Sequence, residues 1–309
     1  MEILELENIK SLPYSTVATI GMFDGVHKGH KFMLQELNTL AKKHNCKSAV
    51  ITFSNHPRTV LDLKQESNPI ELLQTNEERY NKIQESNVDY IFTVLFTKEF
   101  ASISPKEFLD ILKTKLNLHT LLLGYDNSFG NPNNNEFKEI ITKGEYNDIK
   151  IIQDKIALFE NEIEISSSEI RLAIKQGKIR LANAMLEQEY SIQSKVEKGF
   201  QIGQTLGFPT ANIVLPNNKI IPKNGVYATH ILYNNKVYES VTNIGYRPTF
   251  QGKNKTIETF IFNFKENIYN KEVKLMFVDY LREEIHFDSK EELVQQMKKD
   301  CEDAKKILS

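Results

Sequence analysis

The pattern of apolar and polar residues changes near residue 187. Before this point, short apolar runs alternate with stretches whose apolar residues recur at helical spacing, as Met33 and Leu37 do. This order predicts a doubly wound α/β domain, in which helices cover a parallel sheet. We expect strands at 16–20, 47–53, 88–96, 119–124 and 149–153, and helices at 31–44, 76–86, 105–116 and 135–146.

Beyond the change, the apolar runs are short and are separated by Gly, Pro and Asn turns. Such spacing predicts an antiparallel β-barrel or sandwich, and of the two we expect the barrel. The stretch 289–308 predicts a terminal helix, with Ser289 as N-cap and Glu292 as its capping-box partner. We therefore expect two domains, 1–186 and 187–309, in agreement with a length of 309 residues.

The composition and net charge of the chain indicate which kinds of partner and which compartment to expect. The net charge is −2 and the chain has no long basic run, so neither nucleic acid nor an anionic membrane surface is expected as a partner. No stretch approaches the 18 or so consecutive apolar residues of a membrane span, and the first ten residues lack the apolar core of a signal peptide. Cys46 and Cys301 form no metal-binding or disulfide pattern, which favours a reducing cytoplasm.

The segment IGMFDGVHKGH places His27 and His30 on either side of a glycine, directly after a predicted strand. A metal site would need further ligands, and only Asp24 is near. A turn without chemistry is a second interpretation. A phosphate site explains more, because Gly21 and Gly25 let the backbone approach a ligand. The start of the following helix would add amide donors and a positive dipole end.

Two other segments also follow strands directly, HPR at 56–58 and GYDNSFG at 124–130. In a parallel sheet the carboxyl ends of strands share one edge, so all three segments are expected around one pocket. A fourth segment, ISSSEIR, sets three serines before Arg171, a combination suited to β- and γ-phosphates. Taken alone, each of these segments is also consistent with an ordinary turn or helix cap.

Together these motifs resemble a known family. GMFDGVHKGH matches the HxGH signature of Rossmann-like nucleotidyltransferases, in the form typical of bacterial bifunctional riboflavin kinase/FAD synthetases. TFSNHPR, GYDNSFG and ISSSEIR resemble the family's next three blocks, in the same order. The resemblance implies that His27 and His30 are catalytic. It implies ATP and phosphate binding by Gly21, Phe23, Asp24, Gly25, Ser166, Ser167, Ser168 and Arg171, and flavin binding by His56, Pro57, Arg58, Asp126 and Phe129.

The second half resembles the riboflavin kinase part of the same family. GQTLGFPTAN is similar to its signature. The later blocks are matched by NGVYATHI, NIGYRPTF, IETFIFNF and YLREEIHFDSKEELVQQMKKD, the last of which covers 280–300. The resemblance implies that Gly203 and Gly207 let the loop follow the phosphates of ATP. It assigns Thr210 and Asn212 to Mg²⁺ and the nucleotide, Glu258 to general-base catalysis and Arg282 to the flavin.

The implied function is the ATP-dependent phosphorylation of riboflavin to FMN, followed by adenylylation of FMN to FAD with release of pyrophosphate. Three positions depart from the family pattern: Asn127 replaces a frequent aromatic residue, Gln204 an arginine and Phe260 a histidine. The last two motivate an alternative, an FMN adenylyltransferase whose kinase domain binds flavin but is weakly active. A flavin carrier without catalysis is a further alternative, although it would need neither HKGH nor SSSEIR.

Overall fold

The chain folds into two units, residues 1–167 and 168–309. The computed structural model describes residues 2–61, 71–125, 135–154, 156–199, 203, 206–249 and 252–309. Among these, no helix combines the length and the apolar character that a membrane span requires.

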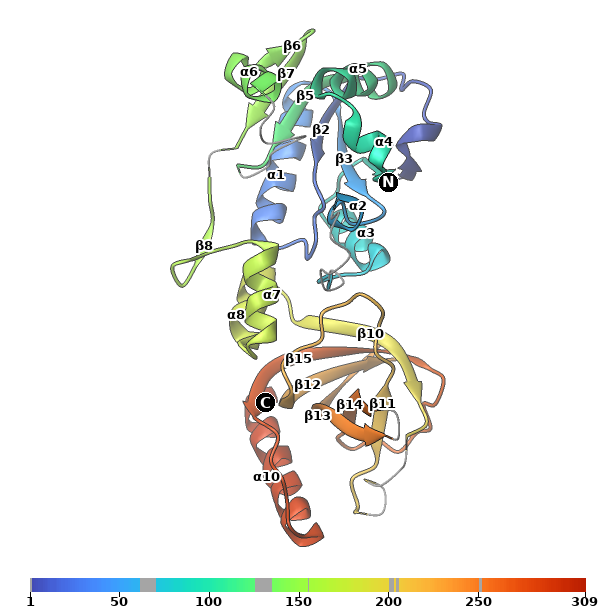
Figure 1. The fold of residues 1–309 in the computed structure, drawn as a ribbon, viewed down its shortest axis with the longest axis vertical. Coiled ribbons are helices and arrows are strands. Elements are labelled where there is room, and N and C mark those ends of the chain that lie inside the picture. Colours follow the sequence, from blue (N-terminus) through green and yellow to red (C-terminus); the bar gives the residue numbers. More distant parts are fainter. Residues whose placement is uncertain are drawn as a thin grey trace. The chain divides into compact units, whose positions relative to one another are not determined.

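The first unit contains a seven-stranded sheet in the order β1-β4-β3-β2-β5-β7-β6 (Figure 1). Only the pairing of β6 with β7 is antiparallel. This confirms the predicted parallel sheet. The strands are β1 Glu2–Glu5, β2 Thr16–Ile20, β3 Lys47–Phe53, β4 Tyr90–Val94, β5 Leu118–Leu123, β6 Glu145–Tyr146 and β7 Ile149–Gln153, and a separate hairpin joins β8 Phe159–Glu160 to β9 Ile163–Glu164.

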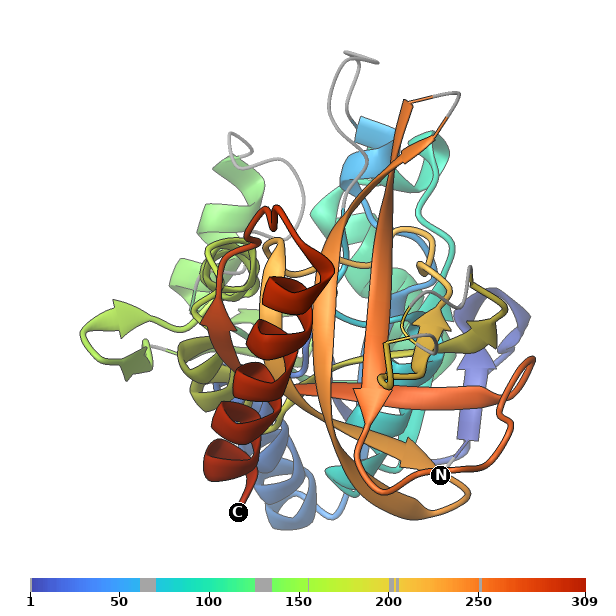
Figure 2. The same ribbon diagram turned by 90° about the horizontal axis from the view of Figure 1, so that it is seen from below.

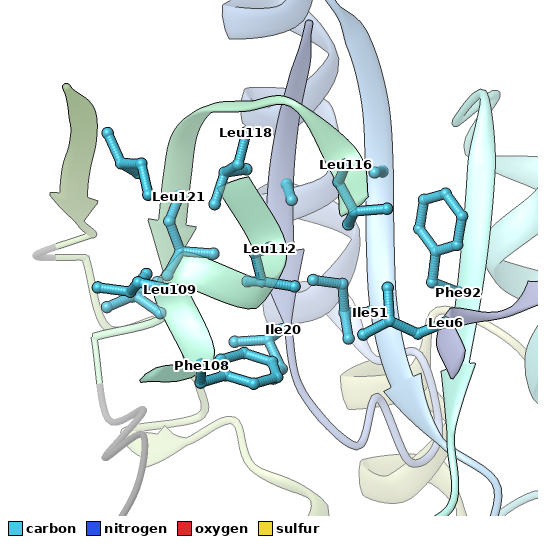
Figure 3. Packing of buried hydrophobic residues seen from close by; sticks show 14 of the residues in the cluster. Leu6, Ile20, Ile51, Phe92, Phe108, Leu109, Leu112, Leu116, Leu118 and Leu121 are labelled. Carbon is cyan, nitrogen blue, oxygen red and sulfur yellow. The ribbon is translucent and has the colours of Figure 1, made fainter. Parts of the chain in front are cut away.

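Helices cover both faces of this sheet because its strands are apolar on both sides. Val17 packs with Leu34 and Leu37 of α1, whereas its neighbour Ala18 packs with the leucines of α5. Figure 3 shows the second cluster, with Leu112 directed toward the strands. The helices are α1 Lys28–Lys43, α2 Arg58–Leu61, α3 Asn76–Glu85, α4 Lys98–Ser102, α5 Pro105–Leu116, α6 Asn135–Lys143 and the 3-10 turn η1 Leu6–Asn8.

The order of the strands places a switch point at β2. From β2 the chain proceeds to β3 and then β4 on one side, and it returns to β5 on the other side of β2. In open α/β sheets the crevice at such a point, beyond the carboxyl ends of the strands, is where ligands bind. The loop 21–27, which contains most of the predicted phosphate motif, begins at this point.

The second unit contains a closed barrel in the order β10-β11-β14-β13-β12-β15, with every pairing antiparallel. This confirms the predicted antiparallel barrel. Helix α10 packs along β12, β13 and β15, as Figure 2 shows. The elements are α7 Ser167–Lys175, α8 Ile179–Leu186, β10 Tyr190–Glu197, β11 Thr210–Ile213, β12 Gly225–Tyr233, β13 Lys236–Thr249, β14 Gly252–Ile261, β15 Glu272–Arg282 and α10 Lys290–Leu308.

Helix α8 packs against the barrel. The Asn183 amide donates to the Phe277 carbonyl at 2.8 Å and accepts from the Tyr190 backbone N–H at 2.7 Å. Met185 is fully buried. These contacts join α8 to the second unit, whereas a domain boundary after residue 186 assigns it to the first. That boundary, as a division of function, stays a prediction.

Candidate functional site

The backbone of the loop after β2 has an unusual conformation. Phe23, Gly25 and Val26 have positive φ angles of 52°, 90° and 39°. This conformation is costly for a β-branched residue such as Val26 and persists only where the surroundings enforce it. Here the enforcement comes from burial, because Phe23 is 1% exposed and Val26 is 0% exposed. Both side chains pack inward, and the loop is fixed at the predicted phosphate site.

Asp24 anchors the same loop. Both of its carboxylate oxygens accept from the Leu73 backbone N–H at 3.0 Å, and one also accepts from the Gln74 N–H at 3.1 Å. The residue is 2% exposed. Its role in the described structure is therefore to tie the loop to the chain before α3. Direct binding of phosphate by Asp24 stays a prediction.

The two histidines lie together at the start of α1. His27 is the N-cap, and its Nδ1 accepts from the His30 backbone N–H at 3.4 Å. The imidazole rings are stacked, with centroids 3.7 Å apart. Because Nδ1 of His27 is an acceptor, a neutral His27 carries its proton on Nε2. His27 thus holds a hydrogen-bond donor on the side of its ring opposite to the cap.

His30 is uncharged at neutral pH. Loss of contact with water, the neighbouring His27 and the guanidinium of Arg79 together hold the pKa of His30 well below its usual range. Within the described part of the chain its Nδ1 is buried and has no hydrogen-bond partner. A neutral imidazole of this kind can donate from Nε2 without carrying a positive charge.

A hydrogen bond joins the fourth motif to the first. The Ser167 hydroxyl, at the start of α7, donates to the Asp24 carbonyl at 2.8 Å. Ser167 and Arg171 are four residues apart and therefore share one face of α7. Ser166 and Ser168 flank this contact in the sequence. Ser167 thus lies at the loop that contains His27, while phosphate binding by the three serines and Arg171 stays a prediction.

The HPR segment leads into the short helix α2, which begins at Arg58. His56 Nδ1 accepts from the Arg58 backbone N–H at 3.2 Å, and the Arg58 side chain is exposed. Since β3 lies directly beside β2, this segment shares one edge of the sheet with the loop 21–27, which we call the histidine loop. The predicted flavin residues Asp126 and Phe129 lie outside the described residues.

A metal site at the histidine pair finds no support in the loop. Asp24, its candidate third ligand, is engaged with backbone amides. Across the residues that the structure describes, no group of three or more His, Cys, Asp and Glu side chains is arranged to hold a metal ion.

The second unit has a cavity of about 370 Å³ on the outside of the barrel. The register of three neighbouring strands places polar residues at the wall of this cavity. Glu258 of β14 lies opposite Asn212 of β11 on one side and opposite Asn243 of β13 on the other. Residues directly opposite each other point to the same face. Thr210, Asn243, Glu258, Phe260, Arg282 and Asp300 all line this cavity.

The turn before β11 requires a glycine. The Gly203 carbonyl accepts from the backbone N–H groups of Leu206 and Phe208, at 3.1 and 2.8 Å. A Cβ atom at position 203 would overlap the Phe208 carbonyl oxygen. Gly207 has a φ of 84° and is exposed. Thr210, which follows this turn, lines the cavity. Gln204 lies outside the described residues.

Two predicted residues have surroundings that the sequence did not indicate. Asn212 is 7% exposed and packs so closely on Gly199 that a side chain there would overlap its amide. Phe260 lines the cavity and packs edge-on against Phe208, with ring centroids 5.3 Å apart.

Arg282 is held by the terminal helix. Its Nε and Nη2 donate to the two carboxylate oxygens of Asp300 at 2.8 and 2.6 Å. Gln296 donates to the same carboxylate at 2.8 Å, and Asp300 is 6% exposed. Sequence reasoning missed Asp300 and also Asn243. Asn243 stands inside a recognised block and Asp300 is the last residue of another, 280–300, but nothing in either block marked these two residues as part of a site.

Comparisons with known proteins identify a family for both parts of the chain. A family model described as FAD synthetase matches residues 9–169, and one described as riboflavin kinase matches residues 186–308. A bifunctional riboflavin kinase/FMN adenylyltransferase of Buchnera aphidicola subsp. Schizaphis graminum is 35% identical, over 98% of this chain and 97% of the relative. Its Bacillus subtilis counterpart is 34% identical, over 97% and 95%. A crystal structure from Streptococcus pneumoniae, described as a macrolide-efflux protein, is 29% identical, with a TM-score of 0.86 over 97% of both chains.

Proposed function

The chain belongs to the family of bifunctional riboflavin kinase/FMN adenylyltransferases, and we propose that two domains, 1–186 and 187–309, divide the two transfer reactions. The second domain transfers the γ-phosphoryl group of ATP to riboflavin, giving FMN and ADP. The first domain transfers the adenylyl group of a second ATP to FMN, giving FAD and pyrophosphate. The observation that supports this division is that the histidine pair at the start of α1 and the cavity lined by Thr210 and Glu258 belong to different parts of the chain.

In the adenylyl transfer, a phosphate oxygen of FMN attacks the α-phosphorus of ATP and pyrophosphate leaves. His27 and His30 donate to phosphoryl oxygens as charge develops, supported by the positive end of α1. Ser166, Ser167, Ser168 and Arg171 bind the β- and γ-phosphates that become pyrophosphate. Gly21, Phe23, Asp24 and Gly25 hold the loop close to ATP, and His56, Pro57, Arg58, Asp126 and Phe129 bind the flavin.

In the phosphoryl transfer, Glu258 accepts the proton of the ribityl 5′-hydroxyl. Thr210 lines the same cavity, and with Asn212 it offers the oxygen ligands that Mg²⁺ prefers. When bound there with ATP, Mg²⁺ would offset the charge of the transferred phosphoryl group. Gly203 and Gly207 form the loop along the phosphates, and Arg282 binds the flavin. Both steps use ATP, and the unpaired Cys46 and Cys301 suit a cytoplasmic enzyme.

The deciding experiment is chromatography of the products formed from riboflavin, ATP and Mg²⁺, with parallel reactions that start from FMN. The proposal expects FMN and FAD from riboflavin, and FAD from FMN. An adenylyltransferase without kinase activity would make FAD only from supplied FMN. A flavin carrier would make neither product. Omission of Mg²⁺ tests the metal separately, because both products should then be lost.

A further inference from the structure

Arg79 of α3 is the largest side chain that is fully buried, at 0% exposure. Its Nη2 donates to the Phe53 carbonyl at 2.6 Å and to Asn76 Oδ1 at 3.0 Å. Its Nη1 contacts Met22 Sδ at 3.5 Å, and the guanidinium carbon lies 5.3 Å from the centre of the Tyr80 ring. Neither the motifs nor the periodicity pointed to this residue.

Arg79 forms no ion pair with a carboxylate. Among the described residues no Asp or Glu pairs with it, and its Nε has no hydrogen-bond partner. The Asp24 carboxylate favours the charge of Arg79 through space, but it is itself bound to backbone amides. Burial lowers the pKa of Arg79, but an arginine remains protonated in proteins. A buried cation without an ion-pair partner is costly, which favours a role for its charge.

The contacts of Arg79 join the two strand ends that carry the predicted site. Met22 lies in the loop after β2, and Phe53 is the last residue of β3, just before the HPR segment. Asn76, which accepts from Arg79, also donates to the Ser54 carbonyl at 2.7 Å. One buried guanidinium thus fixes the backbone on which both the histidine loop and the flavin segment begin.

We propose that Arg79 is a positioning residue of the adenylyltransferase site, where its guanidinium fixes the ends of β2 and β3 and its positive charge, which forms no ion pair, favours the anionic triphosphate. The inference rests on the proposed function of the first unit. A fixed positive charge in a dry environment attracts anions more strongly than one in water. Arg79 acts on the substrates without touching them, because it fixes the position of the histidine loop and makes the electrostatic potential there more positive.

The same charge acts on His30. The titratable and charged groups that act on His30 are His27, stacked on its ring, and Arg79, while Phe23 packs at 5.0 Å. Loss of the Arg79 charge should therefore move the pKa of His30 upward, toward its ordinary value. His30 would then become protonated at a higher pH, and the pH profile of adenylylation should change with it.

The test compares two variants. Arg79→Met removes both the hydrogen bonds of the guanidinium and its charge, whereas Arg79→Lys keeps the charge. Lys82→Met is the matched control, since Lys82 is on the same helix and pairs with Glu85 at 2.8 Å on the exposed side. His30 is titrated by NMR of its labelled ring, assigned with His30→Gln, and FAD formation from FMN and ATP is followed across pH.

We expect Arg79→Met to raise the pKa of His30 and to lower kcat/KM for ATP by about 10- to 100-fold, as misplacement of a site does. Arg79→Lys should leave the titration of His30 in place and raise KM for ATP. Lys82→Met should change neither. A wild-type KM in Arg79→Lys, or a wild-type titration and activity in Arg79→Met, would overturn the proposal. If Arg79→Met does not fold, Arg79→Lys decides alone. If the wild-type chain makes no FAD, the proposed function fails, and the NMR titration still measures the effect of Arg79.

Discussion

Each unit places a buried or half-buried arginine at its candidate site, but only one of the two has a carboxylate partner. Arg282 is bound by both oxygens of Asp300, whereas Arg79 has carbonyl, amide and thioether partners. The proposed chemistry gives a reason for this difference. The kinase step needs a general base, and an unbalanced cation nearby makes a carboxylate a weaker base.

The adenylyl transfer makes the opposite demand. Its nucleophile is the phosphate of FMN, which is already ionised, so no general base is needed. The leaving group is pyrophosphate, and both partners are anions. A positive charge that forms no ion pair is therefore useful in the first unit and harmful beside Glu258 in the second. We therefore expect an arginine to be paired with a carboxylate where the reaction needs a general base, and to lack such a pair where both reacting groups are anions.

The largest effect should come from Glu258→Gln, which keeps the shape of the side chain and removes its basic carboxylate. Loss of a positioned general base costs about 10²–10⁴ in rate, so FMN formation should fall within that range. Initial rates with riboflavin and ATP measure it. FAD formation from supplied FMN is the internal control and should not change. A near wild-type kinase rate would break the comparison, because a base would then not be required in the second unit.

His27→Ala and His30→Ala should each slow FAD formation by about 10²–10³, the usual cost of losing one preorganised donor. The kinase step should proceed normally in both variants. His44→Ala is the matched control, because His44 is the C-cap at the other end of α1, where its ring packs on His119. FAD formation within a few-fold of wild type in both loop variants would contradict the phosphate interpretation of this motif.

Asp300→Asn should raise KM for riboflavin by about tenfold, equivalent to 1.4 kcal/mol of binding free energy. The amide cannot neutralise Arg282 or accept from both of its nitrogens, so the guanidinium leaves its position in the cavity wall. Asp303→Asn on the same helix serves as the control, because Asp303 pairs with Lys306 at 3.0 Å outside the cavity. Steady-state kinetics of FMN formation distinguish the two variants, and equal KM values in both would show that Asp300 does not position Arg282.

Local signals in the sequence predicted much of the fold. The helix 105–116 was predicted with the bounds that the structure shows, and its start was indicated by Pro105 at the first helical position. The structure adds a capping box between Ser104 and Glu107 at the same end. The prediction for α1 began too late, at residue 31, since histidine is not among the preferred N-cap residues and His27 fills that role. Where side chains and backbone amides signal a boundary locally, sequence reasoning is sufficient.

The candidate sites were predictable only where their residues are neighbours in sequence. The loop 21–30 holds its histidines, glycines and aspartate in one short segment. Asp24 is held by residues 73 and 74, and Arg79 lies in a polar stretch that is typical of an exposed helix face. Asp300 is likewise surrounded by charged residues in the sequence, although it is buried. Such partners are set by tertiary packing and strand register, which no local pattern encodes.

The smallest effect we predict is a pH dependence of stability in the first unit, caused by His30. The pKa of His30 is lowered in the folded chain and is about 6.5 when unfolded. As pH falls below about 6.5, the unfolded chain binds a proton that the folded chain does not. The free energy of unfolding should therefore decrease with falling pH, by less than about 1.4 kcal/mol per pH unit for this one proton.

Urea unfolding of the full chain, followed by circular dichroism at pH 7.5, 6.5 and 5.5, measures this slope. His30→Gln should reduce the loss of stability on acidification, because the variant cannot take up the proton. His286→Gln is the control, since His286 is an exposed histidine of the second unit, with 91% of its side chain accessible. Arg79→Met sharpens the comparison: without the positive charge of Arg79, His30 should be protonated more readily in the folded chain, and the slope should flatten. Equal slopes in wild type and His30→Gln would mean that the pKa of His30 is close to its ordinary value, and the electrostatic contrast between the two units would then rest on Arg282 and Asp300 alone.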